Sequence, residues 1–97
     1  MYAVIFRAKT GVQNQEYTHT VTKMRALAFE KYGCLDFIAV TEGSQEIAIS
    51  YWPSEQAILD WKKDPEHIAA QNLGKKSFYQ NYQVEVVEIK RQYQFNR

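Results

Sequence analysis

The sequence predicts an α+β domain of the ferredoxin-like, split βαβ class, with a four-stranded antiparallel sheet and helices on one face. The chain has 97 residues, which is the size of one domain. Its hydrophobic patterns follow the order strand, helix, strand, strand, helix, helix, strand. Isolated glycines and prolines separate these patterns, and no linker does. We therefore expect one domain over residues 1–97, with a core over about 2–91 and a C-terminal arm over 92–97.

The first part of the chain predicts a strand followed by a long helix. Residues Tyr2–Lys9 are rich in β-branched and aromatic side chains, which is typical of a strand. Asn14 can cap a helix that runs from Gln15 to Tyr32, and Gly33 stands where a left-handed C-terminal cap is expected. One face of this helix carries the apolar residues Tyr17, Val21, Met24 and Ala28.

A hairpin and a short helix are predicted next. The strand-like segments Cys34–Glu42 and Glu46–Trp52 are joined by Gly43-Ser44-Gln45, a short glycine-containing connection suited to a hairpin. Pro53-Ser54-Glu55 then ends the second strand and supplies an N-cap. The helix that follows carries Ala57, Ile58 and Trp61 on one face.

The last part of the chain predicts a second helix and a final strand. The break at Asp64-Pro65 ends the short helix, and proline in a first turn favours a new helix that continues through about Tyr79. The segment Tyr82–Arg91 is strand-like and carries apolar residues on both of its faces. A strand of this kind is covered on both sides.

Helices on one side leave an apolar face on the other side of the sheet. Its residues come from the pairs Val4/Ile5, Phe37/Ile38, Ile47/Ala48 and Val86/Val87. A second copy of the chain can cover this face in an isologous dimer. The aromatic residues of the arm Gln92–Phe95 are suited to reaching across the interface. We therefore expect a homodimer.

Composition excludes several classes of function. Twelve Lys and Arg against 11 Asp and Glu give a net charge of +1 without a basic block, which argues against nucleic-acid binding. One cysteine and two histidines cannot build a metal cage of soft ligands, so we expect no metal site. The apolar run Tyr2–Phe6 is too short for a signal peptide or membrane span, so we expect a cytoplasmic protein without a membrane partner. Nucleotide-binding and nucleophile-elbow motifs are absent.

Three segments resemble the antibiotic biosynthesis monooxygenase superfamily: Ile49–Trp61, Pro65–Gln71 and Gly74-Lys75. The resemblance extends from Tyr2 to about Arg91. It implies a dimeric α+β barrel built from two ferredoxin-like protomers. It also implies one of two chemistries: oxidation of aromatic polyketides or quinols by molecular oxygen without flavin, metal or haem, or the binding and cleavage of haem.

The sequence departs from the haem-degrading members of that superfamily at two positions. Their iron-ligating histidine falls ten residues after the tryptophan that resembles Trp61, where this chain has Gln71. Those members also have an asparagine on the first strand, and the corresponding position in this chain falls near Phe6. Both departures argue against haem degradation, although His67 lies one helical turn before Gln71 and could reach the same cleft.

The candidate site lies on the two short helices. Helical spacing places Ala70, Gly74, His67, Phe78 and Gln71 on one arc. Small side chains at Ala70 and Gly74 leave a void in which His67, with Gln71, can act as a base or hydrogen-bond donor toward a phenol. Trp61 offers a flat wall for an aromatic substrate, and we count Phe78, Ala70 and Gly74 with it as substrate-binding residues. The alternative interpretations place Trp61 in the core and His67 in an exposed first turn.

The aromatic residues Tyr51, Trp52, Tyr79 and Tyr82 are expected in the core or at the interface, and the alternative is that one of them lines the cleft. We expect His19 to be exposed and Cys34 to be a structural thiol. The favoured hypothesis is a cofactor-independent monooxygenase that acts on a small electron-rich aromatic molecule. The alternatives are a non-catalytic ligand-binding or regulatory dimer and, third, a haem-binding protein.

Overall fold

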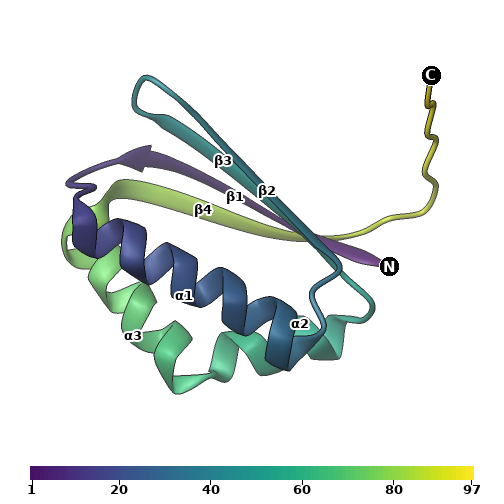
Figure 1. The fold of residues 1–97 in the computed structure, drawn as a ribbon, viewed down its shortest axis with the longest axis horizontal. Helices are drawn as coiled ribbons and strands as arrows, with labels where there is room; N and C mark the ends of the chain where they lie inside the picture. The colour runs from purple at the N-terminus through teal and green to yellow at the C-terminus, as the bar shows by residue number, and fades with distance from the viewer.

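The computed structural model describes all 97 residues and contains one four-stranded antiparallel sheet with its helices on one face (Figure 1). Its elements are β1 (Tyr2–Thr10), α1 (Gln15–Tyr32), β2 (Asp36–Glu42), β3 (Gln45–Trp52), α2 (Glu55–Lys63), α3 (Pro65–Leu73), a π-helical turn (Gly74–Phe78) and β4 (Tyr79–Glu88). The strand order is β2-β3-β1-β4, so β1 pairs with β3 on one side and with β4 on the other. The predicted ferredoxin-like class is confirmed.

The ends of α1 follow the predicted caps. The side-chain oxygen of Asn14 accepts hydrogen bonds from the amides of Glu16 and Tyr17. Gly33 ends the helix with a φ of 73°, and its amide donates to the carbonyl of Ala28. The bounds of α1 are those expected from the sequence. No helix in the structure is long and apolar enough to cross a membrane.

The predicted helix through Tyr79 is too long. It ends at Leu73, a π-helical turn covers Gly74–Phe78, and β4 begins three residues before the predicted strand. The connection after β1 holds this turn, because the amide of Gly11 donates to the carbonyl of Phe78 at 2.7 Å. A Cβ atom on Gly11 would lie 2.5 Å from the Ser77 carbonyl oxygen, so only glycine permits this approach.

Strand β2 is shorter than predicted at its start. It begins at Asp36, because the amide of Cys34 instead donates to Ala28 in the last turn of α1. Strand β4 ends at Glu88, and the residues beyond it extend away from the body of the molecule (Figure 1). Tyr93 and Phe95 in this arm are 87% and 77% exposed.

The core lies at the end of the sheet where β1 starts and β3 ends. It consists of five buried residues: Val4, Ala28, Cys34, Trp52 and Ile58. Trp52 is fully buried, and its indole Nε1–H donates to the Ser50 hydroxyl at 2.8 Å. This packing attaches α1 and α2 to the sheet at that end.

The face of the sheet opposite the helices carries an apolar band. Pairing registers place Ile5, Ile49 and Ile38 side by side across three strands. On the same face, Val40 is 63% exposed and Ile47 is 37% exposed. The strand patterns predicted this apolar face.

Candidate functional site

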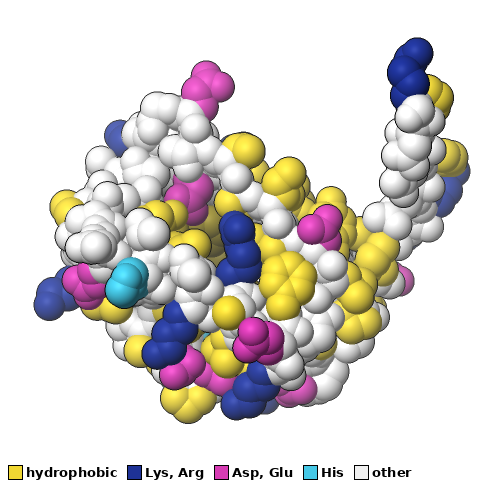
Figure 2. Space-filling model, viewed as in Figure 1, with side chains coloured by type: hydrophobic (Ala, Val, Ile, Leu, Met, Phe, Trp, Pro, Cys, Tyr) yellow, Lys and Arg dark blue, Asp and Glu magenta, His cyan; other side chains and the backbone are white.

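A cavity of about 490 Å³ separates the helices from the inner face of the sheet. Figure 2 shows hydrophobic side chains in a recess on this side of the molecule. The wall on the sheet side is mainly apolar and includes Val4, Phe6, Ala48, Tyr82, Val84 and Val86. Its volume lies within the roughly 300–1,000 Å³ that small-molecule sites occupy.

Five of the six residues predicted for the site line this cavity together. Trp61 comes from α2, whereas His67, Ala70 and Gln71 come from α3 and Gly74 opens the π-helical turn. A Cβ atom on Gly74 would lie 3.3 Å from the ring of Tyr79, so a larger residue would press on that ring. Gly74 therefore lets the helical wall approach Tyr79 of β4 closely.

At one end of the cavity, three aromatic rings lie against one another. The ring centroids of Trp52 and Trp61 are 4.9 Å apart, and those of Trp61 and His67 are 4.1 Å apart. Trp61 thus packs on the core and also lines the cavity. Its Nε1 atom and the Nδ1 atom of His67 are both buried without a hydrogen-bond partner. Unpaired buried polar atoms are rare in folded proteins, and both of these atoms belong to residues that line the cavity.

The environment of His67 favours the neutral imidazole. Burial lowers the pKa of His67 below its ordinary value of 6.5, because the cavity disfavours the charged ring. The residue is half-buried, so the interpretation that places it in an exposed turn is wrong. A neutral imidazole can accept a proton or a hydrogen bond at neutral pH.

Phe78 does not line the cavity as the helical spacing predicts. It is 3% exposed, and its ring meets that of Tyr17 edge to face at a centroid distance of 5.4 Å. The π-helical turn explains the difference, because the 100° spacing of an α-helix no longer applies after Gly74. Phe78 is therefore part of the packing behind the cavity wall.

Sequence reasoning missed a polar cluster at the other end of the cavity. Glu46 is 5% exposed. Its carboxyl group accepts hydrogen bonds from the hydroxyl of Tyr17 at 2.7 Å and from the hydroxyl of Tyr79 at 3.1 Å. The Gln13 amide adds a longer contact of 3.4 Å to the same carboxyl group. Glu46, Tyr17 and Tyr79 all line the cavity. We refer to these three residues as the Glu46 cluster.

Both tyrosines of the Glu46 cluster are held in their protonated form. Burial, followed by the hydrogen bond with Glu46, raises the pKa of Tyr17 to about 12. Burial also raises the pKa of Tyr79 above its ordinary value, assisted by its neighbours Tyr17 and Glu46. Both hydroxyls therefore remain donors toward the carboxyl group over the physiological pH range.

A signal for the Glu46 cluster is present in the sequence. Alternation along β3 places Glu46 on the same face as Ala48, Ser50 and Trp52, all of which are buried. A carboxyl group on a buried strand face requires partners, which predicts nearby donors. The partners themselves lie on α1 and β4, and only the fold brings them to this strand.

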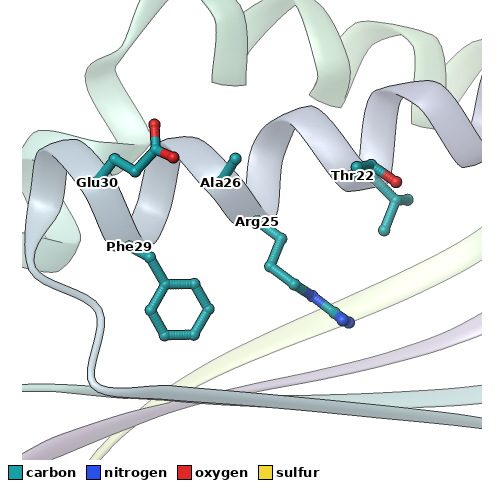
Figure 3. Close-up of a pocket in the computed structure, with 6 residues that line it drawn as sticks. Thr22, Arg25, Ala26, Phe29 and Glu30 are labelled. Atoms are coloured by element: carbon teal, nitrogen blue, oxygen red, sulfur yellow. The ribbon is translucent and has the colours of Figure 1, made fainter.

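A second, shallow groove lies on α1 (Figure 3). Its lining residues all come from this helix, and Arg25 and Phe29 point from it toward the sheet. The guanidinium of Arg25 lies 4.8 Å from the ring centroid of Phe37, a cation–π contact that joins α1 to β2. Neither unpaired buried atom belongs to this groove, so the cavity is the candidate site. No group of three or more His, Cys, Asp or Glu side chains is placed to hold a metal ion.

Comparisons with known proteins identify a relative in sequence and several in structure. The chain is 36% identical over 92 residues to YqjZ, an uncharacterised protein of Bacillus subtilis, covering 94% of this chain and 81% of YqjZ. SnoaB, a cofactor-independent oxygenase from Streptomyces nogalater, matches in structure with a TM-score of 0.78 at 10% identity over 94% of each chain. A candidate antibiotic biosynthesis monooxygenase from Deinococcus radiodurans matches over the whole of both chains, with a TM-score of 0.80 and 13% identity. No family model matches the chain.

Proposed function

The chain belongs to the family of Bacillus subtilis YqjZ, and from this premise and its antibiotic biosynthesis monooxygenase fold we propose a cofactor-independent monooxygenase. Its substrate is a small electron-rich aromatic molecule, such as a quinol or a polyketide-like phenol. The observation that carries the proposal is the apolar cavity in which Trp61 and His67 each hold a buried, unpaired nitrogen. A flat apolar site with a few polar groups suits an aromatic substrate that carries oxygen.

In the proposed reaction, His67 removes the phenolic proton of the bound substrate. Burial keeps its imidazole neutral, so the ring is ready to accept that proton. The indole N–H of Trp61 donates a hydrogen bond to the oxygen that becomes negative. Gln71 positions the substrate from the next turn of α3, and Ala70 and Gly74 leave room for its rings.

The electron-rich anion then reduces molecular oxygen directly. In an anthrone, the ring CH₂ carbon becomes a carbonyl, one oxygen atom enters that carbonyl, and the other leaves as water. The carbon loses four electrons and O₂ gains four, so the step needs no further reductant. The protein supplies a base, an apolar site and exclusion of bulk water.

The apolar outer face of the sheet supports a homodimer as the working form. Ile38 and Val40 on edge strand β2 are 55% and 63% exposed, beside Ile47 and Ile49 of β3. Exposed apolar surface of this kind is typical of an interface. Two sheets that pack face to face would give the barrel that the resemblance implies.

Oxygen uptake tests the proposed activity. The wild-type protein is incubated with a panel of quinols and anthrones, while dissolved oxygen and the oxidised product are followed together. We expect one O₂ consumed for each carbonyl formed from an anthrone. Tight binding of one of these compounds without oxygen uptake would reject the enzyme and favour a ligand-binding protein.

A further inference from the structure

The Glu46 cluster is buried without a compensating positive charge. The two ion pairs in the structure join Lys23 with Glu66 and Lys31 with Asp64, and neither includes Glu46. Hydrogen bonds from two tyrosine hydroxyls and one amide are the partners that hold its carboxyl group. Burying a carboxyl group is costly, and an apolar residue at this strand position would pack without that cost.

The hydrogen bonds within the Glu46 cluster leave it able to accept a hydrogen bond from a ligand but unable to donate one. Tyr17 and Tyr79 both direct their hydroxyl hydrogens at Glu46, so neither has a donor left for a ligand. The carboxyl oxygens have about four acceptor positions, and three are in use. The oxygen that binds Tyr79 accepts no second hydrogen bond from the protein. The free position suits a hydroxyl hydrogen of a ligand.

The opposite end of the cavity has the reverse hydrogen-bonding character. An indole N–H can only donate, so the unpaired Trp61 nitrogen requires an acceptor such as a carbonyl or phenolate oxygen. Trp61 packs against Trp52, and Trp52 lies six residues after Glu46 on β3, which separates these two strand residues by roughly 20 Å at 3.3 Å per residue. The cavity that Glu46 and Trp61 both line has a volume of about 490 Å³, which is enough for several fused rings.

We propose that the Glu46 cluster is a substrate-binding subsite that accepts a hydrogen bond from a phenolic hydroxyl at the end of the cavity away from Trp61. This inference rests on the proposed function and refines its substrate class. The substrate is a multi-ring aromatic with an oxygen acceptor at the reacting end and a hydroxyl donor at the far end. The two ends together fix which way the rings lie in the cavity, and so which carbon meets oxygen.

Binding of two matched quinones tests the subsite. The probes are 2-hydroxyanthraquinone and 2-methoxyanthraquinone, which share a ring system and differ in whether they can donate a hydrogen bond. Quinones are already oxidised, so their binding is independent of oxygenase activity. Quenching of tryptophan fluorescence reports the affinity, at a pH below the pKa of the probe's phenol. Because hydrogen bonds to charged groups are strong, we expect the wild type to prefer the hydroxy probe by roughly ten- to a hundredfold.

A pair of variants tests whether Glu46 causes the preference for the hydroxy probe. Glu46→Gln should reduce it to roughly threefold or less, while its affinity for the methoxy probe stays near that of the wild type. Glu42→Gln removes the same charge from the exposed end of β2 and should leave the preference unchanged. A Glu46→Gln protein that keeps the full preference would overturn the proposal.

The wild-type protein alone also provides a decisive measurement. In infrared difference spectra, the hydroxy probe should shift the carboxyl bands of the protein, and the methoxy probe should not. Equal affinity for both probes, absent binding of the hydroxy probe, or unshifted carboxyl bands would each reject the subsite, even if Glu46→Gln fails to fold. If the protein takes up oxygen with anthrones but binds both probes equally, the subsite is rejected and the oxygenase is not. If it prefers the hydroxy probe but takes up no oxygen, the oxygenase is rejected and the subsite is not.

Discussion

Burial in the cavity wall beside Trp61 lowers the pKa of His67 and favours the neutral imidazole, which is the form that can act as a base. We expect His67→Ala to lower turnover by about 10²–10⁴-fold, which is the usual contribution of general-base catalysis. Folding should be nearly unchanged, because the ring makes no hydrogen bond through its buried Nδ1 atom. Oxygen uptake on a verified substrate measures the effect. His19→Ala is the matched control, since His19 is exposed on α1; unchanged turnover in His67→Ala would dismiss this base.

The pH dependence of kcat/KM should report the same imidazole. Burial lowers the pKa of His67 below 6.5, so the neutral base persists to a more acidic pH than an exposed histidine allows. Activity is therefore expected to fall as the pH drops through that lowered pKa and to level off above it. The inflection should disappear in His67→Ala. An inflection above 6.5 would show that another group is the base.

Among the elements, the C-terminal end of α1 depends on one backbone conformation. Gly33 has a φ of 73°, and a Cβ atom there would meet nothing within 4 Å. A substitution at this position therefore tests backbone conformation alone. Gly33→Ala should reduce the free energy of unfolding by about 1–2 kcal/mol, measured by urea denaturation. Gly33→Asn should reduce the free energy of unfolding by less, because asparagine tolerates the left-handed region. An equal reduction in the two variants would contradict this account.

Local signals in the sequence were sufficient for most elements. Asn14 and Gly33 marked the ends of α1, and Asp64-Pro65 marked the break between α2 and α3. The π-helical turn could not be predicted, because the two residues that follow β1 hold it. The amides of Gly11 and Val12 donate to the carbonyls of Phe78 and Ser77. An interaction between segments more than 60 residues apart in sequence leaves no periodic pattern in either segment.

The difference between local sequence signals and contacts between distant segments also applies to the candidate site. His67, Ala70 and Gly74 lie on one helical stretch, so their spacing placed them together. Glu46 and Tyr17 lie 29 residues apart, on β3 and α1, and only the packing of that helix over the sheet brings them into contact. Residues that meet through tertiary packing remain separate in a pattern read along the chain.

At the scale of the whole molecule, the apolar outer face predicts the state of association. Sedimentation equilibrium should give twice the chain mass, with an interface that buries more than roughly 1,000 Å². Replacing Ile38 and Val40 together by lysine should give monomers, because charged side chains would then face each other across the interface. Val12→Lys, at a 60% exposed position outside the strands, is the control and should stay dimeric. A wild-type monomer at micromolar concentration would reject the homodimer.

The hollow between the helices and the sheet also has a thermal consequence. The side chains that line this cavity contact fewer protein atoms than a close-packed interior provides, so a ligand bound there can add contacts to the folded state. A molecule that fills the space binds only the folded chain, and at a hundred times its Kd it adds about 2.7 kcal/mol of stability. For a domain of this length, that raises the melting temperature by on the order of 10 °C. Heating the protein with a library of aromatic compounds would therefore rank its ligands before any reaction is known.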